Sequence, residues 1–485
     1  MDKNSFLSLQ NGSDIRGVAE GDNPLLSAAI SGRLGRAFAR LILSRTGKRP
    51  FCEYDPARVA VGFDPRPSGR PLARAFCDGL AAEGVTPYAT GISTTPAMFM
   101  GCMDARLAAD GGVMVTASHL PADRNGFKFF TPSGGLGKKD ITALLEDALE
   151  LDPPAPGELP LYFDLMASYT TYLVERVEEW TGKERPLSGR KILVDAGGGS
   201  GGFYVGVLER LGADTAGSLY IEPDPAFSGH IPNPEEDSAM EALRTAVVHA
   251  RADFGIACDT DADRVGLVGP DGRLINHNRM IALAAAVIAP QNKGGVIVTD
   301  SVTSTGLGEF IASLGLVHRR FKRGYKNVID EALRLCESGV HAPLAIETSG
   351  HAAMRENFFL DDGAYLVTRM LPMLAEKGPC GLISALREPA ESVSLRIPAE
   401  KLPADALERL ADFAKKMPGL SLTPDNYEGV RVDCDKTRGN GWLLLRRSLH
   451  DPLFVLDMES DSPGGIAVMK EVLSPILCPL SQSTT

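Results

Sequence analysis

The chain has 485 residues, of which 44% are hydrophobic and 23% are charged, and its net charge is -12. A chain of this length is too long for one hydrophobic core, so we expect several domains. The acidic balance argues against broad binding to nucleic acid or to an anionic membrane, because both require an excess of Lys and Arg. We therefore expect neither partner, although a local basic pocket for a small phosphate remains compatible with this composition.

The cysteines are scattered and form no C-x-x-C pair, which indicates neither a disulfide framework nor a zinc site. Residues 1–14 lack the apolar run of a signal peptide. The longest apolar run, from Met280 to Ala289, is too short to span a bilayer. These features predict a cytoplasmic protein.

The first predicted element is an amphipathic helix between Pro24 and Leu43. Its apolar positions recur at helical spacing and are Leu26, Ile30, Leu34, Phe38 and Leu41. The opposite face carries a row of arginines, Arg33, Arg36 and Arg40. We interpret this row as a solvated surface rather than a ligand site.

Three stretches begin alike, with a β-branched run, a Gly- or Ser-rich turn and then a helical pattern. They are "RVAVGFDPR" (58–66), "KILVDAGGGSGG" (191–202) and "GGVIVTDSVTSTG" (294–306). Each is typical of a β-α unit, so three α/β domains are expected. The glycine run 197–202 formally fits a dinucleotide pattern, but any glycine-rich turn would, and we interpret it as structural.

Each of these regions also contains a second short strand that ends in a polar turn. These strands are "VMVTASH" (113–119), "FGIACDTDADR" (254–264) and "LAIETSGH" (344–351). Ligands of α/β proteins bind at the carboxyl ends of strands, so the three turns suggest one composite site.

Changes in composition and residue pattern predict the domain boundaries. A Pro-rich stretch lies at 151–160, a second break follows residue 273, and a third lies near 385–400. The last region alternates strand-like runs with one or two helices, which is an α+β pattern. The predicted domains are 1–155, 156–273, 274–388 and 389–485.

The loop "DTDADR" supplies Asp259, Asp261 and Asp263, followed by Arg264. Alternate side chains of an extended loop project to the same side, so the three carboxylates could converge. Their mutual repulsion favours a hard divalent cation, and oxygen-only ligands fit Mg²⁺. The alternative is a solvated acidic turn, which the apolar strands on both sides of the loop disfavour.

Two further loops could bind parts of a phosphorylated sugar. In "ETSGH", Glu347 and Ser349 could clamp vicinal hydroxyls, with His351 at the next alternate position; the alternative is a simple strand-ending turn. In "LLLRRSLHDP", guanidinium and hydroxyl groups fit a phosphate site. A basic strand end that faces water explains that stretch equally well. The candidate residues there are Arg446, Ser448 and His450.

The stretch "TASHLPADRNGFKFF" (116–130) places Ser118 and His119 in a turn and Lys128 in an aromatic run. Alone, it would be a Ser/His turn with local hydrogen bonds. Taken in order, however, the four loops resemble those of the α-D-phosphohexomutase superfamily, the phosphoglucomutase/phosphomannomutase enzymes, over nearly the whole chain. The segments "SDIRG" (13–17), "VGFDPRPSG" (61–69), "HIPNP" (230–234) and "FLDDGAY" (359–365) are also similar to family segments.

The resemblance implies an α/β fold of three similar α/β domains with mixed sheets and a C-terminal α+β domain around a central cleft. It implies that Ser118 is phosphorylated and holds one Mg²⁺ ion together with the three aspartates. The implied catalytic residues are Ser118, His119, Lys128, Arg16 and Arg264, with Arg66 near the phosphoserine. The implied substrate-binding residues are Glu347, Ser349, His351, Tyr325, Arg323, Arg446, Ser448 and His450.

The implied activity is a hexose-phosphate mutase, with glucose and mannose phosphates as default substrates. Phosphoserine 118 would donate its phosphoryl group to a hexose phosphate, and the bisphosphate would turn over and return the other phosphate. Glucose 1,6-bisphosphate is the expected intermediate and activator. We expect a lowered pKa for Lys128 that suits proton transfer, and a monomer or homodimer. Alternatives are a phosphoglucosamine mutase, or a catalytically weak paralog that binds sugar phosphates in a regulatory role.

The chain departs from the family pattern at several loop positions. The metal loop has Thr260 where glycine is usual, and the serine loop has Leu120 where asparagine is common. Tyr325 stands where some members carry histidine. The phosphate loop differs most, with Leu449, His450 and Asp451. A phosphate loop that uses His450 would bind better when the imidazole is protonated, which predicts a pH-sensitive affinity.

Overall fold

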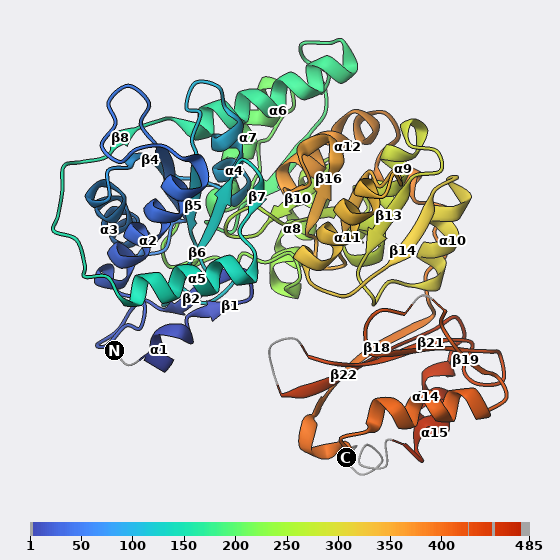
Figure 1. The fold of residues 1–485 in the computed structure, drawn as a ribbon. Coiled ribbons are helices and arrows are strands. Elements are labelled where there is room, and N and C mark those ends of the chain that lie inside the picture. Colours follow the sequence, from blue (N-terminus) through green and yellow to red (C-terminus); the bar gives the residue numbers. More distant parts are fainter. Residues whose placement is uncertain (1–2, 425, 449–451, 477–485) are drawn as a thin grey trace. The chain divides into compact units, whose positions relative to one another are not determined.

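The structure is a computed structural model that describes residues 3–424, 426–448 and 452–476 (Figure 1). The chain forms two compact units. Unit 1 comprises Met1–Ile275, Gly350–Ala352 and Leu360–Pro379, and unit 2 comprises Asn276–Ser349, Ala353–Phe359 and Cys380–Thr485. Each unit is described by itself below.

The first sheet of unit 1 has the strand order β1-β2-β6-β5-β3-β4-β8, with β7 paired to β6. Its strands are β1 (Gln10–Asn11), β2 (Asp14–Val18), β3 (Arg58–Phe63), β4 (Thr86–Ile92), β5 (Gly111–Val115), β6 (Arg124–Thr131), β7 (Gly134–Gly135) and β8 (Leu161–Tyr162). Strand β3 is parallel to β4 and β5, whereas β6 is antiparallel to β5 and β2. The sheet is therefore mixed, as predicted.

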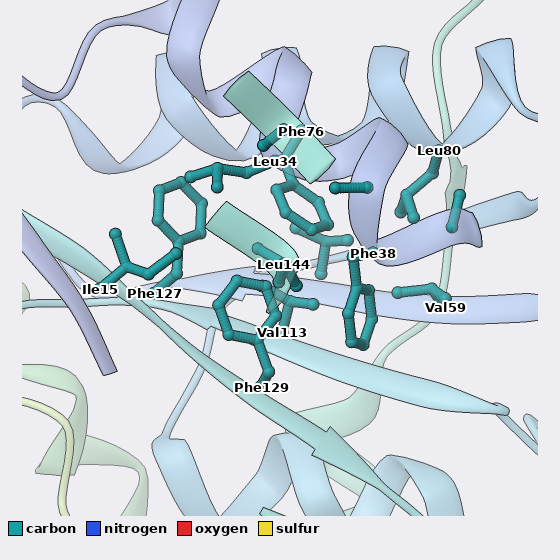
Figure 2. Close-up of a cluster of buried hydrophobic side chains, with 14 of the residues drawn as sticks. Ile15, Leu34, Phe38, Val59, Phe76, Leu80, Val113, Phe127, Phe129 and Leu144 are labelled. Carbon is teal, nitrogen blue, oxygen red and sulfur yellow. The ribbon is translucent and has the colours of Figure 1, made fainter. Parts of the chain in front are cut away.

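Three helices cover one face of this sheet and enclose an aromatic core (Figure 2). They are α2 (Ala28–Thr46), α3 (Gly69–Ala82) and α5 (Lys138–Leu149), while α1 (Lys3–Leu7) and α4 (Thr95–Met103) complete the helices of this region. The rings of Phe38 and Phe129 lie 5.1 Å apart, and those of Phe76 and Phe127 lie 5.5 Å apart. Such buried aromatic pairs add about 0.5–1.5 kcal/mol each beyond their burial.

Helix α2 begins at Ala28 rather than at the predicted Pro24. The reason is local, because the Ser27 hydroxyl accepts a hydrogen bond from the Ile30 N–H and caps the helix. The predicted arginine row is only partly solvated. Arg36 and Arg40 both pair with Glu83, so two of the three arginines tie α2 to the end of α3.

The second sheet of unit 1 has the order β12-β11-β10-β9. Strands β9 (Ile192–Asp195) and β10 (Phe254–Cys258) are parallel, whereas β10 and β11 (Val265–Val268) form an antiparallel hairpin. The remaining elements are β12 (Leu274–Ile275), η1 (Ser200–Phe203), α6 (Leu165–Thr181), α7 (Tyr204–Arg210), α8 (Asp237–Ala250) and α12 (Gly363–Lys377). The glycine run after β9 is a turn that leads into η1, which agrees with its structural interpretation.

Unit 2 contains three parallel strands, in which β13 (Val296–Thr299) lies between β14 (Val317–Arg320) and β15 (Leu344–Ile346). Its helices are α9 (His277–Ile288), η2 (Ala289–Gln291), α10 (Thr305–Ser313) and α11 (Tyr325–Glu337). The short elements that follow β15 in the chain are β16 (Ala352–Met354), η3 (Arg355–Asn357), β17 (Leu360–Asp361) and α13 (Pro379–Leu382).

The last region of unit 2 is an antiparallel sheet of order β18-β22-β21-β20-β19 with its own core. Its elements are β18 (Glu391–Pro398), η4 (Ala399–Lys401), α14 (Ala406–Lys416), β19 (Leu420–Leu422), β20 (Val430–Cys434), β21 (Gly441–Arg447), β22 (Leu453–Ser460) and α15 (Gly465–Leu473). Three α/β regions followed by this sheet confirm the predicted fold class. Within the described residues, no helix is both long and apolar enough to cross a membrane.

Candidate active site

Ser118 lies in a rigid turn between β5 and β6. Its φ is +55°, a left-handed conformation that is uncommon for a residue other than glycine. The Ser118 N–H donates to Thr116 Oγ1 at 2.8 Å, and Arg66 donates to the Ser118 carbonyl. Arg66, which is 2% exposed, also donates to Pro121 O at 2.5 Å and to Asp64 Oδ2 at 3.0 Å. These bonds hold the strained turn and fix the direction of the Ser118 side chain.

The carboxylates of Asp259, Asp261 and Asp263 meet at the tip of the β10–β11 hairpin. All three residues are buried, and each offers an oxygen atom within 4.8 Å of the others. The predicted convergence is therefore confirmed, but the loop is a tight turn with Ala262 at φ +56° rather than an extended segment. The Ser118 hydroxyl donates to Asp259 Oδ2 at 3.3 Å, so the turn and the carboxylates share one location in unit 1.

The donor set of this cluster fits a hard divalent cation. Asp261 Oδ1 and Asp263 Oδ1 are buried and find no hydrogen-bond partner in the part of the chain that the structure describes. Burial, reinforced by Asp263, raises the pKa of Asp259 well above its usual range. A cation bound by these oxygens would offset the electrostatic cost of burying three carboxylates side by side. Carboxylate oxygens are also ligands of the kind that Mg²⁺ prefers.

Lys128 lies on β6 and contacts two of the three carboxylates. Its Nζ is 2.8 Å from Asp261 Oδ2 and also donates to Asp263. Burial alone would lower the pKa of Lys128, but the two carboxylates outweigh it and hold that pKa well above its usual range. The predicted lowering of this pKa is therefore wrong, because the sequence did not place these carboxylates against the ammonium group.

Arg264 connects three acidic or basic groups of unit 1. Its guanidinium donates to Asp259 at 3.0 Å, to Glu235 at 3.1 Å and to His119 Nδ1 at 2.9 Å. Because a guanidinium only donates, Nδ1 of His119 accepts and its proton lies on Nε2. Burial, with the charges of Arg264 and Arg16, lowers the pKa of His119 to about 3. His119 is therefore neutral, and Ser118 Oγ lies 3.3 Å from the same Nδ1.

His351 is placed with the aspartate cluster in unit 1, whereas the sequence grouped it with Glu347 and Ser349. Its Nδ1 lies 2.6 Å from Asp361 Oδ2, and Asp263 is the third member of this group. Burial lowers the pKa of His351, but Asp361 and Asp263 outweigh it and raise the pKa to about 9. Arg16, the other predicted cation of this unit, donates to Asp14 at 3.0 Å and to Ala117 O at 3.4 Å.

Glu347 and Ser349 follow β15 in unit 2. Glu347 Oε1 accepts from the Gly324 N–H at 2.5 Å, and Glu347 Oε2 accepts from the Ser349 hydroxyl at 3.2 Å. The Arg323 N–H donates to Glu428 at 3.1 Å, and Tyr325 begins α11 and is half-buried. The Glu347 carboxylate is thus held next to the turn that contains Arg323 and Tyr325.

Of the predicted phosphate-binding residues, Arg446 lies within β21 and Ser448 directly follows it. Arg446 is 5% exposed, and its Nε lies 3.5 Å from Asp457 Oδ2 on β22. The Ser448 N–H donates to Leu453 O at 2.8 Å. His450, with Leu449 and Asp451, lies outside the described residues.

Three residues that position the site were not singled out from the sequence. Thr95 donates from Oγ1 to Asp261 Oδ2, Glu235 pairs with Arg264, and Asp361 pairs with His351. Asp361 and Glu235 lie in or next to the segments "FLDDGAY" and "HIPNP", which resembled family segments but received no role. Thr95 carried no signal, since threonines at the start of a helix commonly serve as caps, as Thr94 does here.

Three family models match consecutive parts of the chain. The model "Phosphoglucomutase/phosphomannomutase, alpha/beta/alpha domain I" matches residues 8–153, that of domain II matches 167–272, and that of domain III matches 276–390. Together they cover most of the region that contains the aspartate cluster, Ser118 and the sugar loop.

Individual relatives match over nearly the full length. The phosphomannomutase/phosphoglucomutase of Pseudomonas putida is 30% identical over 467 residues, 95% of this chain and 93% of that protein. A phosphoglucosamine mutase of Paracoccus denitrificans is 29% identical over 464 residues, 94% of this chain and 96% of that protein. Among solved structures, a phosphoglucomutase/phosphomannomutase family protein from Burkholderia thailandensis has a TM-score of 0.80 and 26% identity, covering 100% of this chain and 99% of that one.

Proposed function

The chain belongs to the phosphoglucomutase/phosphomannomutase family, and from this premise we propose that it is a hexose-phosphate mutase, an isomerase. It interconverts hexose 1-phosphate and hexose 6-phosphate, with glucose and mannose phosphates as substrates. The observation that carries the proposal is the Ser118 hydroxyl 3.3 Å from Asp259, within a buried cluster whose other two aspartates retain unpartnered oxygens. A nucleophile beside such a cluster fits phosphoryl transfer.

The proposed reaction begins with a phosphoryl group on Ser118 Oγ. The bond between phosphorus and Oγ breaks and a bond to the free hydroxyl oxygen of the hexose phosphate forms. Lys128 gives a proton to the departing Oγ and takes up the hydroxyl proton in its place. The resulting bisphosphate then returns its other phosphate to Ser118 in the reverse sense. One Mg²⁺ ion, bound by Asp259, Asp261, Asp263 and the phosphorylated Ser118, would supply charge neutralisation on the phosphoryl oxygens.

The residues around Ser118 have separate proposed roles. Lys128 is protonated in its carboxylate environment, which fits the donation of a proton to the departing oxygen. Arg264 holds Asp259 and His119 in place through its three contacts. Arg16 and the neutral His119 complete the polar surroundings of the reacting oxygen.

In unit 2, the proposed binding residues are Glu347 and Ser349 for the sugar hydroxyls. Arg323, Tyr325, Arg446, Ser448 and His450 are proposed to bind the phosphate that is not reacting. Because His351 lies with the aspartates, we assign it to the charged cluster and propose that it meets the substrate from there. Glucose 1,6-bisphosphate is the proposed intermediate and activator, and the four domains 1–155, 156–273, 274–388 and 389–485 remain our proposed division.

The test is conversion of glucose 1-phosphate to glucose 6-phosphate by the purified protein with Mg²⁺ and a trace of glucose 1,6-bisphosphate. Ser118→Ala is run alongside, with the exposed Ser133→Ala as the matched control. Turnover that is lost in Ser118→Ala and retained in Ser133→Ala is the expected result. If neither glucose nor mannose phosphate turns over, the proposal fails, and binding without turnover would favour a regulatory sugar-phosphate binder.

A second candidate is a phosphoglucosamine mutase. The observation that favours it is the similarity to the enzyme of that name from Paracoccus denitrificans, at 29% identity. Comparison of kcat/KM for glucose, mannose and glucosamine phosphates in the same assay decides between the candidates.

A further inference from the structure

Thr348 lies between the proposed sugar-binding residues Glu347 and Ser349, and all three of its polar atoms are hydrogen-bonded. Its N–H donates to Asp300 Oδ1 at 3.3 Å, and its hydroxyl donates to Asp300 Oδ2 at 2.6 Å. Its carbonyl accepts from His277 Nδ1 at 3.0 Å, so Nδ1 carries the proton. Thr348 is only 7% exposed, so these bonds are largely shielded from water.

Asp300 directly follows β13, the central strand of the three described above, and its side chain is fully buried. A buried carboxylate is unfavourable unless donors satisfy it. Two donors come from the single residue Thr348. Because Asp300 directly follows β13, its hydrogen bonds fix Thr348 relative to the end of that strand.

His277 donates a hydrogen bond to the backbone carbonyl of Thr348. It is the first residue of α9 and has φ +46°, a left-handed conformation that is uncommon for a residue other than glycine. Such a conformation persists where the surroundings specify it. The hydrogen bond from its Nδ1 to the Thr348 carbonyl is one contact that specifies it.

The geometry has a direct consequence for the neighbouring residues. The N–H of Thr348 belongs to the peptide plane that follows Glu347, and its carbonyl belongs to the plane that precedes Ser349. Because a peptide unit is planar, fixing these two groups fixes both planes and hence the directions in which Glu347 and Ser349 leave the backbone. We infer that Asp300, Thr348 and His277 are positioning residues for the sugar-binding pair, and that the Thr348 hydroxyl is a determinant of sugar-phosphate affinity, an inference that rests on the proposed function.

The experiment compares Thr348→Val, which keeps the shape and removes the hydroxyl, with Thr348→Ser, which keeps the hydroxyl. Dissociation constants for glucose 6-phosphate are measured by calorimetry on the full chain. Thr348→Val is expected to bind about 10-fold more weakly, since a hydrogen bond to a charged group is lost. Thr348→Ser is expected to stay near the wild type.

A double-mutant cycle with Glu347→Gln separates positioning from a general loss of structure. If Thr348 acts through Glu347, then Thr348→Val adds less than about 3-fold in the Glu347→Gln background. Full additivity of the two losses would overturn the inference. His277→Phe, which removes the donor on the other side of Thr348, is the second variant and is expected to show the same pattern.

A measurement without ligand keeps the inference distinct from the proposed function. The Gly324 N–H is bonded to Glu347 Oε1, so its hydrogen exchange reports the position of that carboxylate. Exchange is expected to accelerate about 10-fold in Thr348→Val and to stay unchanged in Thr348→Ser. Unchanged exchange in Thr348→Val overturns the positioning role. A wild type with neither turnover nor sugar-phosphate affinity overturns the proposed function and the affinity claim, while the exchange result still decides the positioning.

Discussion

The carboxylates of the two units are held in different ways. In unit 1, Asp259, Asp261 and Asp263 are balanced by the charged groups of Lys128 and Arg264, and two of their oxygens remain without a partner in the described chain. In unit 2, Glu347 accepts from one backbone N–H and one hydroxyl. The aspartate cluster therefore carries an electrostatic cost that a cation can relieve, whereas the Gly324 N–H and the Ser349 hydroxyl help to set the direction of the Glu347 carboxylate. Substitutions at the aspartate cluster should therefore act through charge and metal binding, and substitutions around Glu347 should act through the direction of its side chain.

The largest effect is expected from Asp261→Asn. This change removes one proposed metal ligand and one charged partner of Lys128, and it should lower turnover about 10²- to 10³-fold. The measurement is kcat with saturating substrate over a Mg²⁺ titration, with the exposed Asp22→Asn as the matched control. A variant with full turnover and unchanged Mg²⁺ dependence would contradict the assignment of this carboxylate.

Thr95→Val should weaken the metal site less. Thr95 Oγ1 donates to Asp261 Oδ2, and loss of a contact that orients a ligand typically costs about 10-fold or more in metal affinity. Calorimetry with Mg²⁺ measures the change, and Thr95→Ser, which retains the donor, is the control. Equal affinities for the valine and serine variants would show that this hydroxyl does not orient Asp261.

Glu347→Gln should separate the two regions. It removes the charge that accepts the proposed sugar hydroxyls, and we expect KM for glucose 1-phosphate to rise about 10-fold. Mg²⁺ affinity should stay unchanged, because the proposed carboxylate ligands belong to unit 1. The exposed Glu337→Gln is the control. A loss of Mg²⁺ affinity in Glu347→Gln would break the distinction between the regions.

The smallest effect concerns the titration of His351. The pKa of His351 is about 9, above its ordinary value of 6.5, because Asp361 and Asp263 outweigh the effect of burial. The stabilisation of the folded state by protonated His351 is therefore complete below about pH 6.5, and it is lost as the pH rises through about 9. Asp361→Asn should lower this pKa by about one unit in EDTA. Proton NMR of labelled histidine measures it, and an unchanged pKa would remove Asp361 as its cause.

Much of the candidate site could be predicted from the sequence because the signals are local. Ser118, Asp259 and Glu347 each follow a short, buried, mostly apolar strand, and strand ends bring polar side chains to a sheet edge. The convergence of the three aspartates was predictable for the same reason, although the turn at Ala262, not an extended loop, produces it. Motif order then indicated the family.

The charge states could not be predicted in this way. Lys128 lies between two phenylalanines in the sequence, which suggested a lowered pKa, but its side chain meets Asp261 and Asp263, more than 130 residues away. His351 is two residues from Ser349 in the sequence, yet its carboxylate partner is Asp361, whose position depends on the fold. A pKa depends on distances in space, and the sequence does not contain them.

The sequence by itself determined the fold class, the order of the loops and the type of chemistry, because hydrophobic periodicity and short motifs act over a few residues. Tertiary structure alone decided which groups hold those loops. Arg66 donates a hydrogen bond to Ser118, 52 residues away in the sequence, and Asp300 accepts one from Thr348, 48 residues away. Such partners are selected by the packing of strands and helices that are distant in the chain, so their effect on Ser118 and Glu347 becomes visible only once the sheets are assembled.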